Sequence, residues 1–306
     1  MIVRLTYRSG PYRVKGYVGL PPGCGAPPEA LQSLAAARGG LPAAELPVDV
    51  VAEAVRVSYR PHTMLRPASS EAASAVPPRA TSPRPDGAPY PYPALVLCRG
   101  GVGGFGRVRP HWVDDFAARG FVVFAPCYRG NEGGEGRDEF GGADREDVAE
   151  AIALLRTFPF VDRDRVSVAG FSRGSINAAR AAVDAPDAVR RLVLWSGVAD
   201  LARTYEERVD LRRTLKRILG GTPAKRPEAY RERSPLALAP RLRCPTLVVH
   251  GAKDPQVDVG HGLAMYEALR ALGAPVDLHL YEGFAHLFPY AAHQAAVDRM
   301  AAWLLE

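Results

Sequence analysis

The sequence predicts a doubly wound α/β fold, in which helices cover both faces of a mostly parallel sheet. Short apolar segments rich in valine, leucine and phenylalanine recur at 94–98, 121–126, 166–171, 192–197, 246–251 and 277–283. They do not alternate with polar residues, and continuous apolar strands are typical of a parallel sheet buried on both faces. Segments with helical periodicity lie between them, at 112–120, 144–158, 175–185, 260–273 and 293–306. This alternation of strand and helix predicts the fold class.

The first residues predict an antiparallel hairpin at one edge of this sheet. The segments "VRLTYRS" and "YRVKGYVGL" are separated by Gly-Pro, which favours a tight turn. Helix boundaries are also marked. Asp144, with Asp147 three residues later, predicts an N-cap, and Gly120 and Gly273 stand where helices should end.

We expect a single domain over 1–306 that carries two additional segments. Residues 22–93 read as an irregular, proline-rich insertion with a helix at 28–39 and a strand at 53–61. A lid, an oligomer contact and a surface loop all remain open for this insertion, and so does homo-oligomer formation. Residues 198–243 are arginine-rich and helix-like, which predicts a small helical cap.

The composition disfavours several classes of function. The net charge is +6, but arginines are spread along the chain among acids rather than gathered in the patch that nucleic acids require. No apolar run reaches the roughly 18 residues that span a membrane, and no signal peptide is recognisable, so we expect a cytoplasmic protein.

The four cysteines do not predict a metal site. Cys24, Cys98, Cys127 and Cys244 lack CxxC spacing and a nearby histidine cluster, so zinc is disfavoured. Cys98 and Cys127 each follow a predicted strand and could approach each other, but small buried apolar thiols kept reduced are the simpler interpretation. We expect no cofactor.

The stretch "GFSRGS" at 170–175 predicts a nucleophilic serine. Gly170 and Gly174 flank Ser172 in the G-x-S-x-G pattern, with a strand before it and a helix after it. In such an elbow, glycines permit a sharp turn that exposes the serine hydroxyl. A hydroxyl needs a base to become a nucleophile, so the rest of the chain must supply one.

His286 is the predicted base, because it follows the last strand and therefore lies in a loop at the carboxyl edge of the sheet. Asp254, after the strand 246–251, reaches the same edge and would orient the imidazole. Asp258 is its competitor. Of the other histidines, we expect His250 to be structural and His261 and His293 to lie on the surface.

The oxyanion hole requires two donors aimed at the developing negative charge. The backbone N–H of Arg173 is one candidate, and Gly100 or Gly101, in the glycine-rich loop after the first central strand, supplies the other. Such a loop could instead cradle phosphate, but it lacks the lysine and spacing of a P-loop. Arg99 and Phe171 are candidate substrate-binding residues.

Together these motifs resemble the prolyl oligopeptidase family. The segments "YRSGPYRVKGYVGLP", "YRGNEGGEGRDEFGGADREDV", "GFSRGS", "HGAKDPQV" and "GFAHLF" are similar to the hairpin, loop and catalytic motifs of that family. The resemblance implies an α/β-hydrolase fold with Ser172, Asp254 and His286 as the triad. We also expect Tyr128 and Arg129 to brace the active-site loops.

The sequence departs from the family at points that bear on substrate. Arg99 stands where histidine or tyrosine is frequent, Gln256 where arginine is common, and no β-propeller fits before residue 94. We therefore expect a carboxylic esterase working through an acyl-enzyme, with a peptidase for short peptides and a catalytically silent binding module as alternatives. Arg99 and Arg173 could favour acidic substrates at the pocket mouth, but surface salt bridges are the preferred interpretation.

Overall fold

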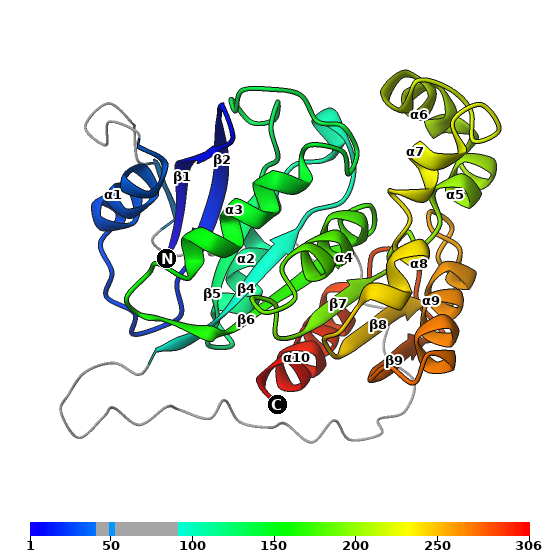
Figure 1. Cartoon of the computed structure of the whole chain (residues 1–306). Helices are drawn as coiled ribbons and strands as arrows, with labels where there is room; N and C mark the ends of the chain where they lie inside the picture. Colours follow the sequence, from blue (N-terminus) through cyan, green and yellow to red (C-terminus); the bar gives the residue numbers. More distant parts are fainter. Residues whose placement is uncertain (41–48, 53–90) are drawn as a thin grey trace.

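The structure, a computed structural model, describes residues 1–40, 49–52 and 91–306. These residues form a nine-stranded sheet in the order β3-β1-β2-β5-β4-β6-β7-β8-β9 (Figure 1). The strands are β1 (Ile2–Ser9), β2 (Tyr12–Gly19), β3 (Asp49–Ala52), β4 (Tyr92–Cys98), β5 (Val122–Pro126), β6 (Val161–Phe171), β7 (Leu192–Trp195), β8 (Thr246–Gly251) and β9 (Val276–Tyr281). The principal helices are α1 (Pro28–Gly39), α2 (Pro110–Ala117), α3 (Arg145–Leu155), α4 (Gly174–Asp184), α5 (Leu201–Glu207), α6 (Arg212–Leu219), α7 (Pro227–Arg231), α8 (Pro235–Leu238), α9 (Val259–Ala271) and α10 (Tyr290–Leu305).

The amino-terminal hairpin is confirmed. β1 and β2 pair antiparallel from Ile2 opposite Gly19 to Ser9 opposite Tyr12, and Gly10 takes the positive φ of 56° that the tight turn requires. β2 joins the main sheet antiparallel to β5. β3 adds a short antiparallel edge strand to β1, which the sequence analysis did not predict.

The six apolar segments form the parallel part of the sheet, as expected. β5, β4, β6, β7, β8 and β9 are successive parallel neighbours. Their continuous apolar sequence is explained by burial on both faces, since every residue of β5, β7 and β8 is buried. Parallel strands end at one edge, so the loops after β4, β6, β8 and β9 meet there.

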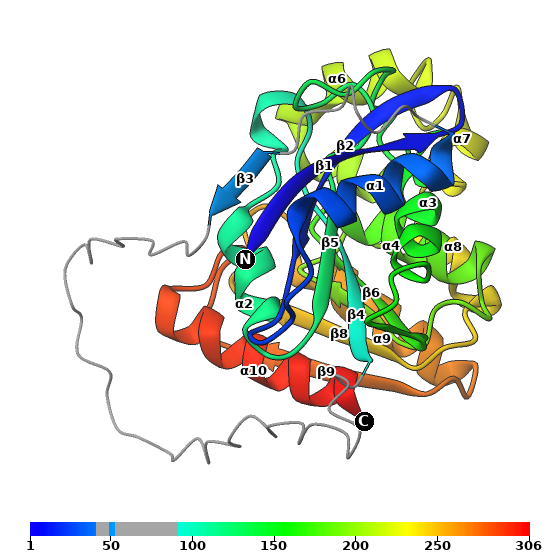
Figure 2. The ribbon, with the colours of Figure 1, turned by 90° about the vertical axis from the view of Figure 1, so that its left-hand side faces the viewer.

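Helices cover both faces of the sheet (Figure 2). One core lies under α2 and α10, with Trp112, Phe116 and Met300 against the strands. The other lies under α1, α3, α4, α8 and α9, with Leu31 and Ile152 among its members. The predicted helix ends at Gly120 and Gly273 are confirmed, with φ of 93° and 68°.

The segment 198–243 is helical, as expected, and has a small core of its own. Leu215 of α6 and Tyr230 of α7 pack with Phe140, Ile176 and Val257, which come from loops and a helix near the carboxyl ends of the strands. Helices α5–α7 therefore stand at the edge of the sheet where the predicted site residues lie (Figure 1).

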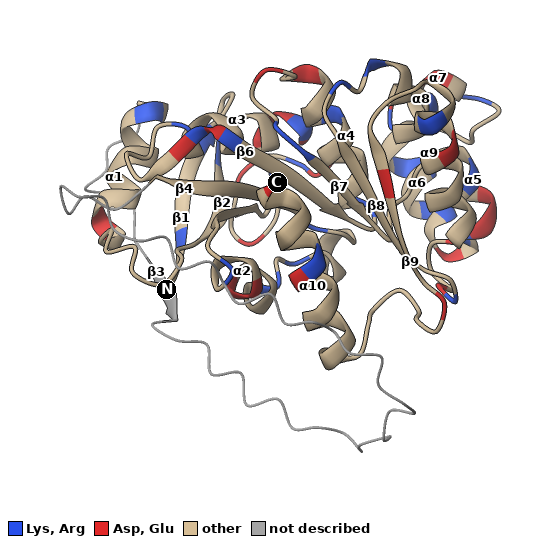
Figure 3. Cartoon of the chain, turned by 90° about the horizontal axis from the view of Figure 1, so that it is seen from below, with Lys and Arg blue, Asp and Glu red and all other residues tan. Residues whose placement is uncertain are grey.

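Three further expectations concern the insertion, the charge distribution and membranes. The helix at 28–39 is confirmed as α1, whereas the strand at 53–61 lies outside the described residues. Basic and acidic residues are interspersed in the view from below the molecule (Figure 3), as the sequence predicts. Among the described residues, no helix is long and apolar enough to span a membrane.

Candidate active site

Ser172 lies in a sharp turn between β6 and α4. Its φ is 55°, a left-handed backbone conformation that residues other than glycine rarely adopt. Its N–H donates to the Trp195 carbonyl at 2.9 Å, which fixes the turn. The flanking glycines are sterically required, because a Cβ on Gly170 would lie 2.6 Å from the Gly174 carbonyl and one on Gly174 would collide with the Cys98 carbonyl. Ser172 remains partly exposed, so its hydroxyl is accessible.

His286 and Asp254 are brought together by the loops after β9 and β8. Nδ1 of His286 lies 2.7 Å from Oδ2 of Asp254, and both residues are buried. The other carboxylate oxygen, Oδ1, accepts the N–H groups of Gln256 at 2.8 Å and Val257 at 3.0 Å. Burial raises the pKa of Asp254, but hydrogen bonds from His250 and His286 outweigh it and hold the pKa well below its usual value. The carboxylate is therefore ionised and oriented toward the imidazole.

The competitor Asp258 has a different position. Its Oδ1 accepts the Gly260 N–H at 2.9 Å as the N-cap of α9 and also pairs with Arg203 at 2.6 Å. It thus acts in helix capping and a surface ion pair, and Asp254 is the acid that contacts His286.

Three other histidines for which the sequence made predictions are buried in packing roles. His250 is fully buried, and its Nε2 lies 2.9 Å from the Val257 carbonyl and 3.5 Å from Oδ2 of Asp254. The surface placement predicted for His261 and His293 is wrong, because these residues are 1% and 6% exposed. His261 accepts the Ala199 N–H, and His293 packs against the rings of Trp112 and Trp195 and pairs with an acid of α2. A helical pattern alone does not show which helix face is covered.

Ser172 and His286 line one cavity of about 370 Å³ at the carboxyl edge of the sheet. The loop after β4 contributes Gly100 and Gly101 to the same wall, and the cap segment contributes Arg208. Phe171 is part of this wall as well, and its ring lies 4.8 Å from the imidazole of His286, centroid to centroid. Every residue of the predicted site except Asp254, which stands behind His286, therefore borders this cavity.

The glycine loop packs directly against the serine. A Cβ on Gly100 would lie 2.9 Å from the Cβ of Ser172, so only glycine allows this approach. The Gly101 carbonyl accepts Nη1 of Arg173 at 2.9 Å, and the Gly100 carbonyl accepts Nη1 of Arg99 at 3.2 Å. In a trans peptide the carbonyl and the N–H point in opposite directions. The N–H of Gly101, which shares a peptide with the Gly100 carbonyl, is thus directed away from Arg99.

Arg99 and Arg173 are held in a buried ion-pair network. Arg173 binds Asp138 at 2.6 Å and Asp144 at 2.8 Å, and Arg99 binds Asp138 at 3.2 Å. The preferred prediction of salt bridges is confirmed, but their placement on the surface is wrong, since both arginine side chains are at most 4% exposed. Both side chains are held beneath the glycine loop, because the loop carbonyls and the carboxylates of Asp138 and Asp144 accept their N–H groups.

Two acids predicted to cap α3 instead belong to buried ion pairs. Asp144 stands at the N-cap position of α3, as predicted, but its carboxylate makes no capping hydrogen bond and accepts from Arg173 and the Gly141 N–H. Asp147 binds Arg129 at 2.8 Å and accepts its backbone N–H at 2.7 Å. The neighbouring Tyr128 is fully buried and donates to the Arg99 carbonyl at 3.3 Å. Tyr128 and Arg129 thus contact the loops around the cavity.

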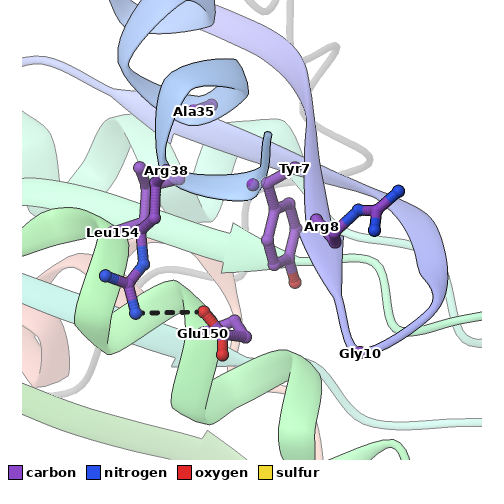
Figure 4. Close-up of a pocket in the computed structure, with 8 residues that line it drawn as sticks. Tyr7, Arg8, Gly10, Ala35, Arg38, Glu150 and Leu154 are labelled. Atoms are coloured by element: carbon purple, nitrogen blue, oxygen red, sulfur yellow. Dashed lines mark hydrogen bonds and ion pairs between the residues drawn. The ribbon is translucent and has the colours of Figure 1, made fainter. Parts of the chain in front are cut away.

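A second cavity lies elsewhere, between α1, β1 and α3 (Figure 4). Its volume is about 240 Å³, and its lining includes Tyr7, Arg8 and an ion pair of 3.1 Å between Arg38 and Glu150. None of the predicted site residues lines it. Of these two cavities, the one at Ser172 is therefore the one that gathers the predicted site residues.

The four cysteines all lie in the described part of the chain, and the absence of a metal stays an expectation. All four cysteines are free thiols, and burial raises the pKa of Cys98 to about 12. No cluster of ligands suited to a metal ion occurs in residues 1–40, 49–52 and 91–306.

The sequence analysis missed two residues of this region. Asp138, which bridges Arg99 and Arg173, lies in the acidic, glycine-rich stretch "GRDEFGGAD", whose density of acids was the available signal. Arg109, in the cavity wall, had no distinguishing pattern.

Comparisons with known proteins identify relatives of this chain. Residues 108–306 match the prolyl oligopeptidase family. The uncharacterized peptidase YtmA of Bacillus subtilis is 43% identical over 216 residues, which are 71% of this chain and 84% of YtmA. Dipeptidyl-peptidase 5 of Porphyromonas gingivalis is 25% identical over 64% of this chain but only 30% of its own length.

Solved structures show the same fold. An acylaminoacyl peptidase in complex with Z-Gly-Gly-Phe-chloromethyl ketone superimposes with a TM-score of 0.66 and 17% identity, covering 99% of this chain and 41% of that chain. A puromycin hydrolase superimposes with a TM-score of 0.59 and 27% identity over 70% of this chain and 34% of its own. The chain therefore belongs to the prolyl oligopeptidase family, has the α/β-hydrolase fold of that family, and is a serine hydrolase.

Proposed function

We propose that this chain is a peptidase that cleaves short peptides through an acyl-enzyme on Ser172. The observation that carries the proposal is the contact of 2.7 Å between Nδ1 of His286 and Oδ2 of Asp254, beside a serine in a strained, accessible turn. Relatives named as peptidases support peptides over the esters that the sequence analysis put first. The esterase becomes the second candidate.

The acyl-transfer steps follow from the roles of the three side chains. Ser172 Oγ attacks the scissile carbonyl while Nε2 of His286 takes the hydroxyl proton. Asp254, bound at Nδ1, fixes the tautomer that leaves Nε2 free to accept and stabilises the imidazolium. The imidazolium then protonates the departing amine. A water molecule attacks the acyl-serine while His286 takes its proton, and the imidazolium returns this proton to Oγ of Ser172 as the carboxylic acid product leaves.

The oxyanion of each tetrahedral intermediate needs donors on the opposite side of the carbonyl. We assign the backbone N–H of Arg173 and that of Gly101, with Gly100 as the residue that lets the loop approach Ser172. The side chains of Arg99 and Arg173 act indirectly, because they hold the carbonyls of this loop.

Carboxylic esters are the second candidate because one wall of the cavity departs from the family pattern. Gln256 lines the cavity at a position where arginine is common in the family. Ester cleavage uses the same attack on a carbonyl and has a better leaving group, so the same residues would carry it.

A fluorophosphonate probe tests the catalytic proposal. We expect covalent labelling of the wild-type chain and none of Ser172→Ala. Failure to label supports a silent binding module instead, and labelling that persists in Ser172→Ala rejects Ser172 as the nucleophile. A panel of aminoacyl nitroanilides beside nitrophenyl esters decides between the two substrates. Turnover of esters without turnover of any anilide or short peptide would reject the peptidase.

A further inference from the structure

Five arginines line the cavity, and Arg109 and Arg107 are the two for which no ion pair is found among the described residues; Arg109 is the one of these two that lies over aromatic rings. Arg173 and Arg208 line the same cavity, but each is paired with an acid, Arg208 with Asp210 at 2.7 Å. Arg109 makes no ion pair with any residue of 1–40, 49–52 or 91–306. Arg109 is exposed in part, and the partial burial of its guanidinium lowers its pKa, with no acid opposing this effect. The cavity thus contains a cation whose charge is not neutralised by the described part of the protein.

The guanidinium of Arg109 is held by aromatic rings. Its Cζ lies 4.9 Å from the ring centroid of Trp112 and 5.8 Å from that of Phe171. Trp112 is itself fixed, since it stacks on Trp195 at 4.7 Å. A guanidinium that lies on aromatic faces keeps its N–H edges available, and these edges match a carboxylate in a bidentate arrangement. The site is therefore oriented as well as charged.

The position of Arg109 relative to His286 indicates which half of a substrate it meets. Phe171 touches both groups, because its ring centroid is 4.8 Å from the imidazole of His286. The imidazole must hand its proton to the leaving atom, so the leaving half of the substrate lies against His286. Leu287, the next residue in the chain, is 45% exposed and also lines the cavity.

We propose that Arg109 forms a carboxylate subsite for the leaving half of the substrate. For a peptide this group is the free α-carboxylate of a short departing fragment, so cleavage near a carboxyl terminus is favoured. The inference rests on the proposed function, because "leaving half" is defined by attack of Ser172. It replaces the idea that Arg99 or Arg173 selects acidic substrates, since both are neutralised by Asp138 and Asp144.

Matched substrates that differ only in charge test this subsite. The first pair is an N-acetyl dipeptide with a free carboxyl terminus and its carboxamide. The second is 4-carboxyphenyl butyrate and 4-carbamoylphenyl butyrate, which serves if the chain prefers esters. We expect the ratio of kcat/KM for acid over amide to fall about tenfold in Arg109→Gln, mainly through KM, the scale of one charge-assisted hydrogen bond in a partly solvated site.

Two further variants make the test specific. Arg109→Lys keeps the positive charge but lacks the paired N–H donors of a guanidinium, so it should recover only part of the acid-over-amide ratio of kcat/KM. Arg243→Gln removes an exposed arginine before the amino-terminal end of β8, at the opposite edge of the sheet, and should leave the ratio unchanged. An unchanged ratio in Arg109→Gln overturns the subsite. 4-Nitrophenyl hemisuccinate carries its carboxylate on the acyl half, whereas 4-nitrophenyl butyrate carries none. If Arg109→Gln loses a preference for the hemisuccinate while the ratios for the two leaving-group pairs stay unchanged, the assignment of Arg109 to the leaving half is overturned.

A binding measurement separates this inference from the proposed function. Titration of 4-hydroxybenzoate into the wild-type chain, followed by NMR, reports anion binding without turnover. At least tenfold weaker binding by Arg109→Gln supports the subsite even where fluorophosphonate labelling fails and the hydrolase proposal falls. Equal binding by both chains, with labelling intact, overturns the subsite and leaves the hydrolase proposal standing.

Discussion

Replacing Asp138 by asparagine should destabilise the fold, because this carboxylate separates two buried arginines. Its side chain is 9% exposed and binds Arg173 at 2.6 Å and Arg99 at 3.2 Å. Burial raises the pKa of Asp138, but the charge and hydrogen bonds of Arg173 outweigh it and bring the pKa to about 2, from an ordinary value of 3.8. By linkage, this difference corresponds to about 2 kcal/mol of folding free energy at pH 7.

The asparagine variant should lose at least that contribution. Asparagine keeps the shape of the side chain but removes the charge, which leaves Arg99 and Arg173 facing each other with Asp144 as the remaining acid. An uncompensated buried charge costs about 3–5 kcal/mol, so we expect a loss of about 2–4 kcal/mol in the free energy of unfolding. Because Arg99 and Arg173 hold the glycine loop, kcat should also fall.

Urea unfolding followed by tryptophan fluorescence at pH 7 measures this loss. The pKa of Asp138 is depressed in the folded state, so its contribution is complete above pH 4 and disappears as the pH falls toward 2. The difference between wild type and Asp138→Asn should therefore shrink below pH 4. Asp184→Asn is the control, since its pair with Arg180 is exposed and worth about 0.5 kcal/mol. A cost for Asp138→Asn no greater than that of the control would refute the reasoning.

Three further predictions follow from the site and the core. Asp254→Asn should lower kcat about 10⁴-fold while circular dichroism is unchanged, because the imidazole loses its orienting carboxylate; a loss under tenfold would speak against Asp254. Gly100→Ala should lower fluorophosphonate labelling at least tenfold, since the added methyl meets Ser172 at 2.9 Å; labelling at the wild-type rate would show that the loop yields. Cys98 and Cys127 should resist iodoacetamide at pH 8 until guanidinium is added, because burial raises both thiol pKa values, and rapid native modification seen by mass spectrometry would contradict this.

The order of strands and helices could be read from the sequence because it depends on local patterns. Continuous apolar runs, glycines at helix ends and the Gly-Pro turn each act over a few residues, and they predicted the parallel strands and the hairpin. The chain order of Ser172, Asp254 and His286 was likewise visible, since each follows its own predicted strand and parallel strands end at a common edge.

Partners across long sequence separations were decided by the tertiary structure. Arg173 meets Asp138, 35 residues away, and His293 of α10 pairs with Asp115 of α2, 178 residues away. No local pattern encodes such distances, because charged side chains take whichever counter-ion packing brings near. The carboxylates of Asp144 and Asp147 thus bind arginines in place of capping α3, and two histidines predicted on the surface are buried. Arg109, with no acid partner among the described residues, is a consequence of the same packing.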